Sequence, residues 1–170
     1  MNLIETFQNL VAQVPDLIQP LIVAAAAAVP FIEGEGAAAI GIVGGIHPVI
    51  AAIAAVAGNF LCVALVVLLG AGARQAVVAR AGARGGEPES VDVAPRSEAR
   101  REKFARAFAR YGVPGVSLLG PLLIPTQFTA AMLAASGIGR TRILIWQLIA
   151  IIGWTTAVTL ILTGVITAFS

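Results

Sequence analysis

Two long apolar runs constrain the fold of this chain more than any other feature. Residues 50–73 and 143–169 carry no acidic or basic side chain. Each exceeds the roughly 20 helical residues needed to cross a hydrocarbon core of about 30 Å. The chain is 58% hydrophobic and 12% charged, whereas soluble domains are roughly 45–50% apolar and 25% charged. The sequence therefore predicts an all-α integral membrane protein.

The reactive side chains are too few for the common catalytic and metal sites. The chain has a single histidine, His47, and a single cysteine, Cys62, which excludes an internal disulfide. It has no HExxH sequence, P-loop, Rossmann fingerprint or Ser-His-Asp set. We expect no enzymatic activity, no metal, no cofactor and no nucleic-acid partner. No basic residue precedes Arg74, so the N-terminus lacks the positive region of a signal peptide.

The apolar segments follow one plan twice. Residues 17–46 are interrupted by Glu-Gly-Glu-Gly and precede a full-length run at 49–72. Residues 114–137 are interrupted by Pro-Thr-Gln and precede a full-length run at 143–169. Each half is therefore an interrupted pair of short helices followed by one transmembrane helix.

Two further segments are predicted to lie at the membrane surface. Residues 1–14 form an amphipathic pattern with an apolar face of Leu3, Phe7, Leu10 and Val14. Residues 74–111 read as a charged, Gly/Pro-rich loop and a basic amphipathic helix. The basic side chains of that helix are Arg100, Arg101, Lys103, Arg106 and Arg110. They suit the anionic headgroups of a lipid bilayer, and a solvated helix that caps the protein is an equal alternative.

The positions of the 11 basic residues predict the topology. Nine lie within residues 74–110, and the other two are Arg140 and Arg142. Basic residues mark the cytoplasmic side. All 11 lie on that side only if residues 114–137 enter the membrane and return as a re-entrant hairpin. Pro121 and Pro125 would interrupt a full-length helix there in any case.

The same reasoning makes residues 17–46 a hairpin that enters from the outer face, because the run at 49–72 must end inside. The two halves then form inverted repeats in a multi-pass protein of the inner membrane, with residues 74–111 cytoplasmic. Such repeats place binding sites near the midplane, at the ends of broken helices. The alternative is that residues 17–32 form a short complete span, which would move the N-terminus inside.

Two glutamates are the leading candidates for a site. Glu33 and Glu35 would lie at the tip of the first hairpin, where burial favours a protonated carboxyl group. Such a pair suits proton coupling or cation binding. Gly34 and Gly36 would let the backbone bend between them and expose amides. The alternative is a solvated external loop.

Three polar residues would complete this site. Asn59 lies near the middle of the first long run, where an amide must find a partner. Thr126 and Gln127, at the second tip, would face the glutamates across a midplane cavity. His47 would relay protons at the outer surface or cap a helix end.

Two stretches carry a resemblance to a known family. "PFIEGEGAAAIGIVGGIHPVIAAIAAVAGN" and "FARYGVPGVSLLGPLLIPTQFTAAMLAASG" resemble the two halves of the small multi-drug export family, a relative of the DedA/VTT (SNARE-associated) membrane proteins. The resemblance covers residues 29–154 and matches Glu33 to the family glutamate, Gly58-Asn59 to its GN pair, and Pro121 or Pro125 to its hairpin proline. It implies paired re-entrant hairpins and transport of lipids or lipid carriers, often coupled to protons. The family's hairpin arginines are missing here, so a lipid phosphate would lack its most obvious cationic ligand.

These observations predict a small proton- or cation-coupled transporter or lipid translocase that functions as a homodimer or within a larger complex. The alternative is a non-transporting subunit that organises a larger membrane assembly.

Overall fold

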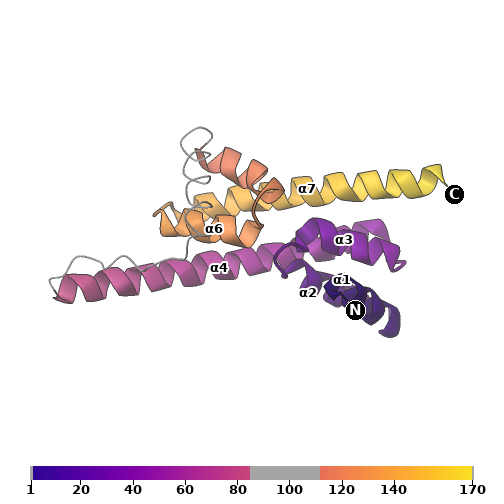
Figure 1. Cartoon of the computed structure of the whole chain (residues 1–170), viewed down its shortest axis with the longest axis horizontal. Coiled ribbons are helices and arrows are strands. Elements are labelled where there is room, and N and C mark those ends of the chain that lie inside the picture. Colours follow the sequence, from indigo (N-terminus) through magenta and orange to yellow (C-terminus); the bar gives the residue numbers. More distant parts are fainter. Residues whose placement is uncertain (1, 85–111, 170) are drawn as a thin grey trace.

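Two long helices dominate the structure, a computed structural model that describes residues 2–84 and 112–169. They are α4 (Pro48–Arg84) and α7 (Arg140–Ala168). They pack against each other and run in opposite directions (Figure 1). The described residues form helices and no strand, which confirms the all-helical prediction for this part of the chain.

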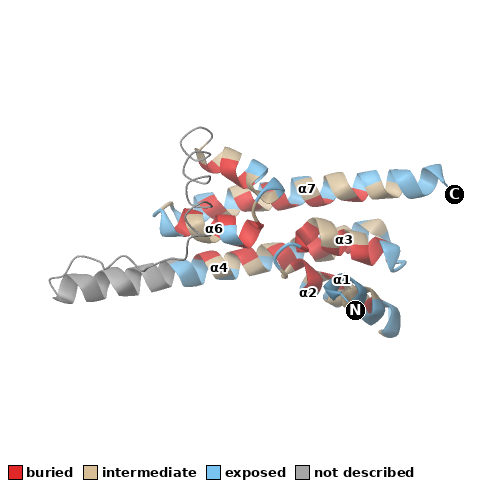
Figure 2. Ribbon diagram, in the orientation of Figure 1, coloured by how far each residue is buried: buried red, intermediate tan, exposed pale blue. Residues whose placement is uncertain are grey.

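Both long helices contain stretches that are long and apolar enough to cross a membrane. These stretches are Pro48–Gly70, with 23 residues, and Arg140–Ala168, with 29. Within their most apolar windows only 28% and 22% of the residues are buried, whereas the core helix of a soluble protein is mostly buried. Exposed faces therefore cover much of both helices (Figure 2), a pattern typical of a membrane protein.

Three further helices belong to the interrupted segments and are too short to cross a membrane. They are α2 (Gln19–Ala27), α3 (Glu33–Val43) and α6 (Thr126–Ala135), with 9, 11 and 10 residues. At 1.5 Å per residue each is about 14–17 Å long, roughly half of a hydrocarbon core. Residues 17–32 therefore do not form one continuous helix, as the alternative of a complete span would need, because α2 ends at Ala27.

The first long helix extends further than predicted. We expected it to end at residue 72 and a loop to begin at residue 74, but α4 continues to Arg84. Its added residues are rich in Ala and Arg, which favour helix, and no proline occurs between Pro48 and Pro88. The predicted basic helix lies outside the described residues, together with Arg100, Arg101, Lys103, Arg106 and Arg110.

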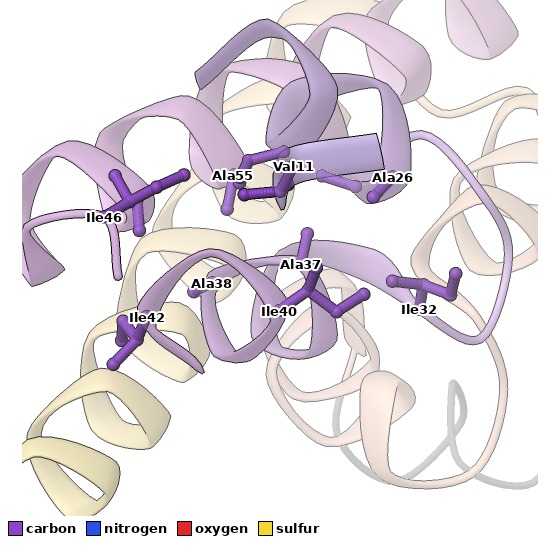
Figure 3. Packing of buried hydrophobic residues seen from close by; sticks show 12 residues of the cluster. Val11, Ala26, Ile32, Ala37, Ala38, Ile40, Ile42, Ile46 and Ala55 are labelled. Atoms are coloured by element: carbon purple, nitrogen blue, oxygen red, sulfur yellow. The ribbon is translucent and has the colours of Figure 1, made fainter. Parts of the chain in front are cut away.

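The apolar side chains form two separate cores. The first joins α1 (Leu3–Gln13), α2, α3 and the first part of α4, and nine of its residues are labelled in Figure 3. The second joins the later part of α4, the helical segment Gly112–Leu122, α6 and the first half of α7. The buried residues of the second core are Val63, Val67, Val113, Val116, Ala130, Leu133, Ala134, Ile143 and Ile151.

The N-terminal helix packs on the first core through Val11 and Phe7, whereas the sequence predicted only a position at the membrane surface. Its N-terminus is capped by a reciprocal pair of hydrogen bonds between Asn2 and Glu5, a capping box. Val11 is fully buried where Gly44 leaves room for it, whereas Leu3 and Leu10 remain exposed. Only part of the predicted apolar face of α1 is therefore free for the bilayer surface.

Candidate functional site

A polar cluster lies between the two apolar cores. Along α4, Ala51 and Ala55 belong to the first core, Val63 and Val67 belong to the second, and Asn59 lies between them. Four elements meet at Asn59, namely the starts of α3 and α6 and the middles of α4 and α7. Their buried polar side chains are Glu33, Asn59, Thr126, Gln127 and Thr155.

Glu33 is the first residue of α3 and is only 6% exposed. The solvated-loop alternative is therefore wrong for this side chain. Its Oε1 accepts hydrogen bonds from the backbone N–H of Thr126 and from Thr126 Oγ1, the latter at 2.8 Å. Thr126 begins α6, and the N-cap residue of that helix, Pro125, makes no capping hydrogen bond through its side chain. The carboxyl group of Glu33 accepts from the Thr126 N–H instead and so caps α6. The predicted meeting of the two interrupted segments occurs at this contact.

The remaining contacts bring Asn59 and Gln127 into the same network. Asn59 Oδ1 lies 3.1 Å from Thr126 Oγ1 and 3.4 Å from Gln127 Nε2. Sequence reasoning required a partner for the amide of Asn59, and these two residues of α6 supply it. Asn59 Nδ2 has no hydrogen-bond partner among the described residues.

The hydrogens of this network can be counted. A hydroxyl carries one hydrogen, so Thr126 donates either to Glu33 or to Asn59. If it donates to Asn59, the 2.8 Å contact with Glu33 requires a proton on the carboxyl group. If it donates to an ionised Glu33, the Asn59 amide turns over so that its nitrogen donates to the Thr126 oxygen. The Gln127 amide then turns over too, so that its oxygen accepts from Asn59 in place of the present bond from Gln127 Nε2. One geometry therefore accommodates a protonated and an ionised Glu33.

The backbone before α3 is unusual. Phe31 and Glu33 have φ angles of 73° and 53°, a region that side-chain-bearing residues seldom occupy. Such conformations cost of order 1–3 kcal/mol and persist where the surroundings enforce them. Here the hydrogen bonds from Thr126 hold the Glu33 side chain, and the strained turn directs it toward α6.

The roles predicted for the two glycines are wrong. We expected Gly34 and Gly36 to form the bend, but both lie in the first turn of α3, and the bend comprises residues 28–32. Gly34 instead allows close packing, because a Cβ there would collide with Thr155 Oγ1 and lie 3.6 Å from Asn59 Nδ2. In the second interrupted segment, Pro121 lies in the 3-10 turn η1 (Gly120–Leu122) and Pro125 precedes α6, so both break the helix as predicted.

Two other candidates lie apart from the network. Glu35 is half-buried, and none of the contacts described above involves its carboxylate. His47 is exposed, and its Nδ1 accepts a hydrogen bond of 3.3 Å from Val49 N at the start of α4. It therefore caps this helix, the simpler of its two predicted roles. It precedes Asn59 by 12 residues, about 18 Å along a helix, too far for direct proton transfer.

Sequence reasoning assigned no role in the site to Thr155, Gln147 or Thr159. All three are buried polar residues on one face of α7. The available signal was their spacing, because positions 147, 151, 155 and 159 share a helical face. Among the described residues, no group of three or more His, Cys, Asp or Glu side chains could hold a metal.

Comparison with known proteins gives no family for this chain: no family model, no curated protein and no solved structure matches it. The site must therefore be interpreted from its own geometry.

Proposed function

We propose that this chain is a small membrane transporter in which two re-entrant hairpins meet at the bilayer midplane and Glu33 takes up the coupling proton. The depth of the polar cluster supports this. Asn59 lies 11 residues from either end of the Pro48–Gly70 stretch, and Thr155 lies close to the middle of α7. If both helices cross the bilayer, these side chains lie near its centre. Binding sites of transporters built from inverted repeats lie at that depth.

The turns of the two short-helix pairs support a position inside the bilayer. Phe31 is 76% exposed and Leu123 is 79% exposed, although both adjoin the buried cluster. Large apolar side chains at an exposed turn suit lipid better than water, since turns in water favour small and polar residues. Irregular backbone at membrane depth is tolerated where protein covers its polar groups.

The geometry favours a proton over a metal cation at Glu33. The α6 N-terminus, which carries partial positive charge, points at the carboxyl group and would repel a cation. Thr126 Oγ1 lies 2.8 Å from Glu33 Oε1 and 3.1 Å from Asn59 Oδ1, which are hydrogen-bond distances. A proton on Glu33 completes this chain of hydrogen bonds.

One observation carries the proposal: the buried Glu33 carboxyl group joins the two interrupted segments through Thr126, whose N–H and hydroxyl are uncharged partners. An ionised carboxylate that only neutral groups stabilise is costly at membrane depth. The network accommodates both protonation states, so a proton can enter and leave without rebuilding the fold. The resemblance noted above is the support for a lipid or lipid-carrier cargo.

The test is proton flux in proteoliposomes, followed with an internal pH dye under an imposed pH gradient. Glu33→Gln keeps the shape of the side chain but cannot take up a proton, so we expect flux to fall at least about tenfold. Glu35→Gln is the matched control, because it makes the same chemical change two residues away. We expect it to retain most of the wild-type flux.

Unchanged flux in Glu33→Gln would overturn the coupling role. No flux in the wild-type protein, together with stable co-purification with a large partner, would favour the non-transporting subunit instead.

A further inference from the structure

One face of α7 carries buried polar atoms that the proposed site does not use. Gln147, Thr155 and Thr159 are 0%, 0% and 9% exposed. Neither polar atom of the Gln147 side chain nor either threonine hydroxyl has a hydrogen-bond partner within the described part of the chain. An unpaired polar group destabilises a protein interior, and lipid offers it no alternative partner.

The same helix shows how a threonine normally avoids this cost. The hydroxyl groups of Thr163 and Thr167 each donate to the backbone carbonyl four residues earlier, both at 2.8 Å. A threonine within a helix commonly makes this hydrogen bond. The hydroxyl groups of Thr155 and Thr159 do not make it, and that of Thr155 lies over Gly34 in the seam between α7 and α3.

The missing partner must be small, since these atoms are sealed inside the protein. Buried water meets this requirement and typically binds two to four polar groups. Thr155 Oγ1 and Asn59 Nδ2, both unpaired among the described residues, face Gly34 within 4 Å of the position that its Cβ would occupy. Since a Cβ collides with Thr155 Oγ1 there, that position itself cannot hold a water molecule, and a water shared by the two atoms must lie on the side away from the Gly34 backbone.

We propose that this seam binds ordered water at Thr155 with Asn59 and, on either side, at Gln147 and Thr159. From residue 147 to residue 159 the stripe extends about 18 Å along α7, more than half of a hydrocarbon core. Buried Ile151 separates the water at Gln147 from the water at Thr155, so the stripe holds separate sites. The water at Thr155 and Asn59 is the one beside the Glu33 network and gives its proton a partner, and this second statement rests on the proposed function. The other titratable groups nearby in the described chain are Glu35 and Cys62, whose thiol lies beside Gln127.

X-ray radiolysis of the protein in proteoliposomes tests the water directly, because it converts bound water into hydroxyl radicals that oxidise an adjacent side chain without a reagent having to enter the sealed site. Thr155→Cys and Thr159→Cys, made in a Cys62→Ala background, place an oxidisable thiol at each proposed water. Mass spectrometry measures the extent of oxidation at each residue. The controls are Leu160→Cys and Ile161→Cys, which replace apolar side chains that are 65% and 66% exposed. We expect the two buried positions to be oxidised at least about tenfold faster than the two exposed, lipid-facing ones; equal or slower oxidation would overturn the proposal.

An isosteric change supplies a second measurement. Thr155→Val removes a hydroxyl at nearly constant volume. If the hydroxyl binds water, we expect Tm to fall by about 2–4 °C, whereas a rise in Tm would show a hydroxyl without any partner and contradict the proposal. Thr163→Val, at a hydroxyl bonded to its own helix, is the control for the loss of a bond to protein. Fast oxidation at residue 155 together with undiminished flux in Glu33→Gln would support the bound water and exclude the proton coupling. Slow oxidation at residue 155 together with lost flux in Glu33→Gln would exclude the bound water and support the proton coupling.

Discussion

At the scale of single residues, Glu33 caps a helix and, in the proposed function, also takes up a proton. Its Oε1 caps the N-terminus of α6, and its carboxyl group lies in a network with two proton arrangements. The first role is structural and needs only an acceptor oxygen. The second role needs a group that can take up a proton.

Substitutions at this residue should separate the two roles. Glu33→Ala removes the acceptor for the Thr126 N–H and hydroxyl, so we expect it to destabilise the protein by about 1–2 kcal/mol. Glu33→Gln keeps an acceptor oxygen and should lose less than half of that stability while losing proton flux. Thermal unfolding in detergent measures the stability, and equal losses in both variants would contradict the capping role.

Gly34 makes a second residue-scale prediction. A Cβ at this position collides with Thr155 Oγ1, so we expect Gly34→Ala to cost about 1–3 kcal/mol. Adding Thr155→Ala removes the colliding atom, and the double variant should recover most of the loss. A strictly additive double-mutant cycle in thermal unfolding would exclude this contact as the cause.

At the scale of helices, close contact between backbones sets the arrangement. A Cβ at Gly58 of α4 would collide with the backbone of Ala24 in α2, whereas one at Gly153 of α7 meets nothing within 4 Å. The small residues along α2 and α3 let these helices approach α4 more closely than larger side chains would allow.

These two glycines form a matched pair for measurement. Gly58→Ala must push two helices apart, and we expect a loss of more than about 2 kcal/mol. Gly153→Ala adds helix propensity without a clash and should be neutral or stabilise by up to about 1 kcal/mol. Similar thermal unfolding of the two variants would show that α2 does not approach α4 at residue 58.

At the scale of the whole molecule, a polar cluster separates two apolar cores, and the exposed turns beside it are apolar. A water-soluble protein would expose Phe31 and Leu123 to solvent at a cost, but a bilayer provides them with lipid. The proposed topology places both turns inside the hydrocarbon core, His47 at the outer surface, and the start of α7 at the cytoplasmic surface.

Labelling with a membrane-impermeant thiol reagent tests this topology in a Cys62→Ala background. We expect Phe31→Cys and Leu123→Cys to remain unlabelled from both sides, although both positions are exposed. His47→Cys should react from outside only, and Thr141→Cys from inside only. Free labelling at residue 31 or 123 would make those turns wet loops and would rule out the re-entrant hairpins.

The sequence alone determined the helical class, the two long apolar helices, the break at Pro121 and Pro125, and the polar residues to examine. These features follow from composition and from constraints of the backbone, which act locally. It misplaced the first bend, because no local signal marks the positive φ angles of Phe31 and Glu33, two residues with side chains.

Which polar residues meet depends on long-range packing. Glu33 and Thr126 are 93 positions apart, and the packing of four elements joins them. Glu35 has the same chemistry as Glu33 but lies on another side of α3, so burial distinguishes the two carboxylates where composition does not. Thr155 entered the site because Gly34 leaves room for its hydroxyl, a fit that exists only once α3 and α7 are in contact.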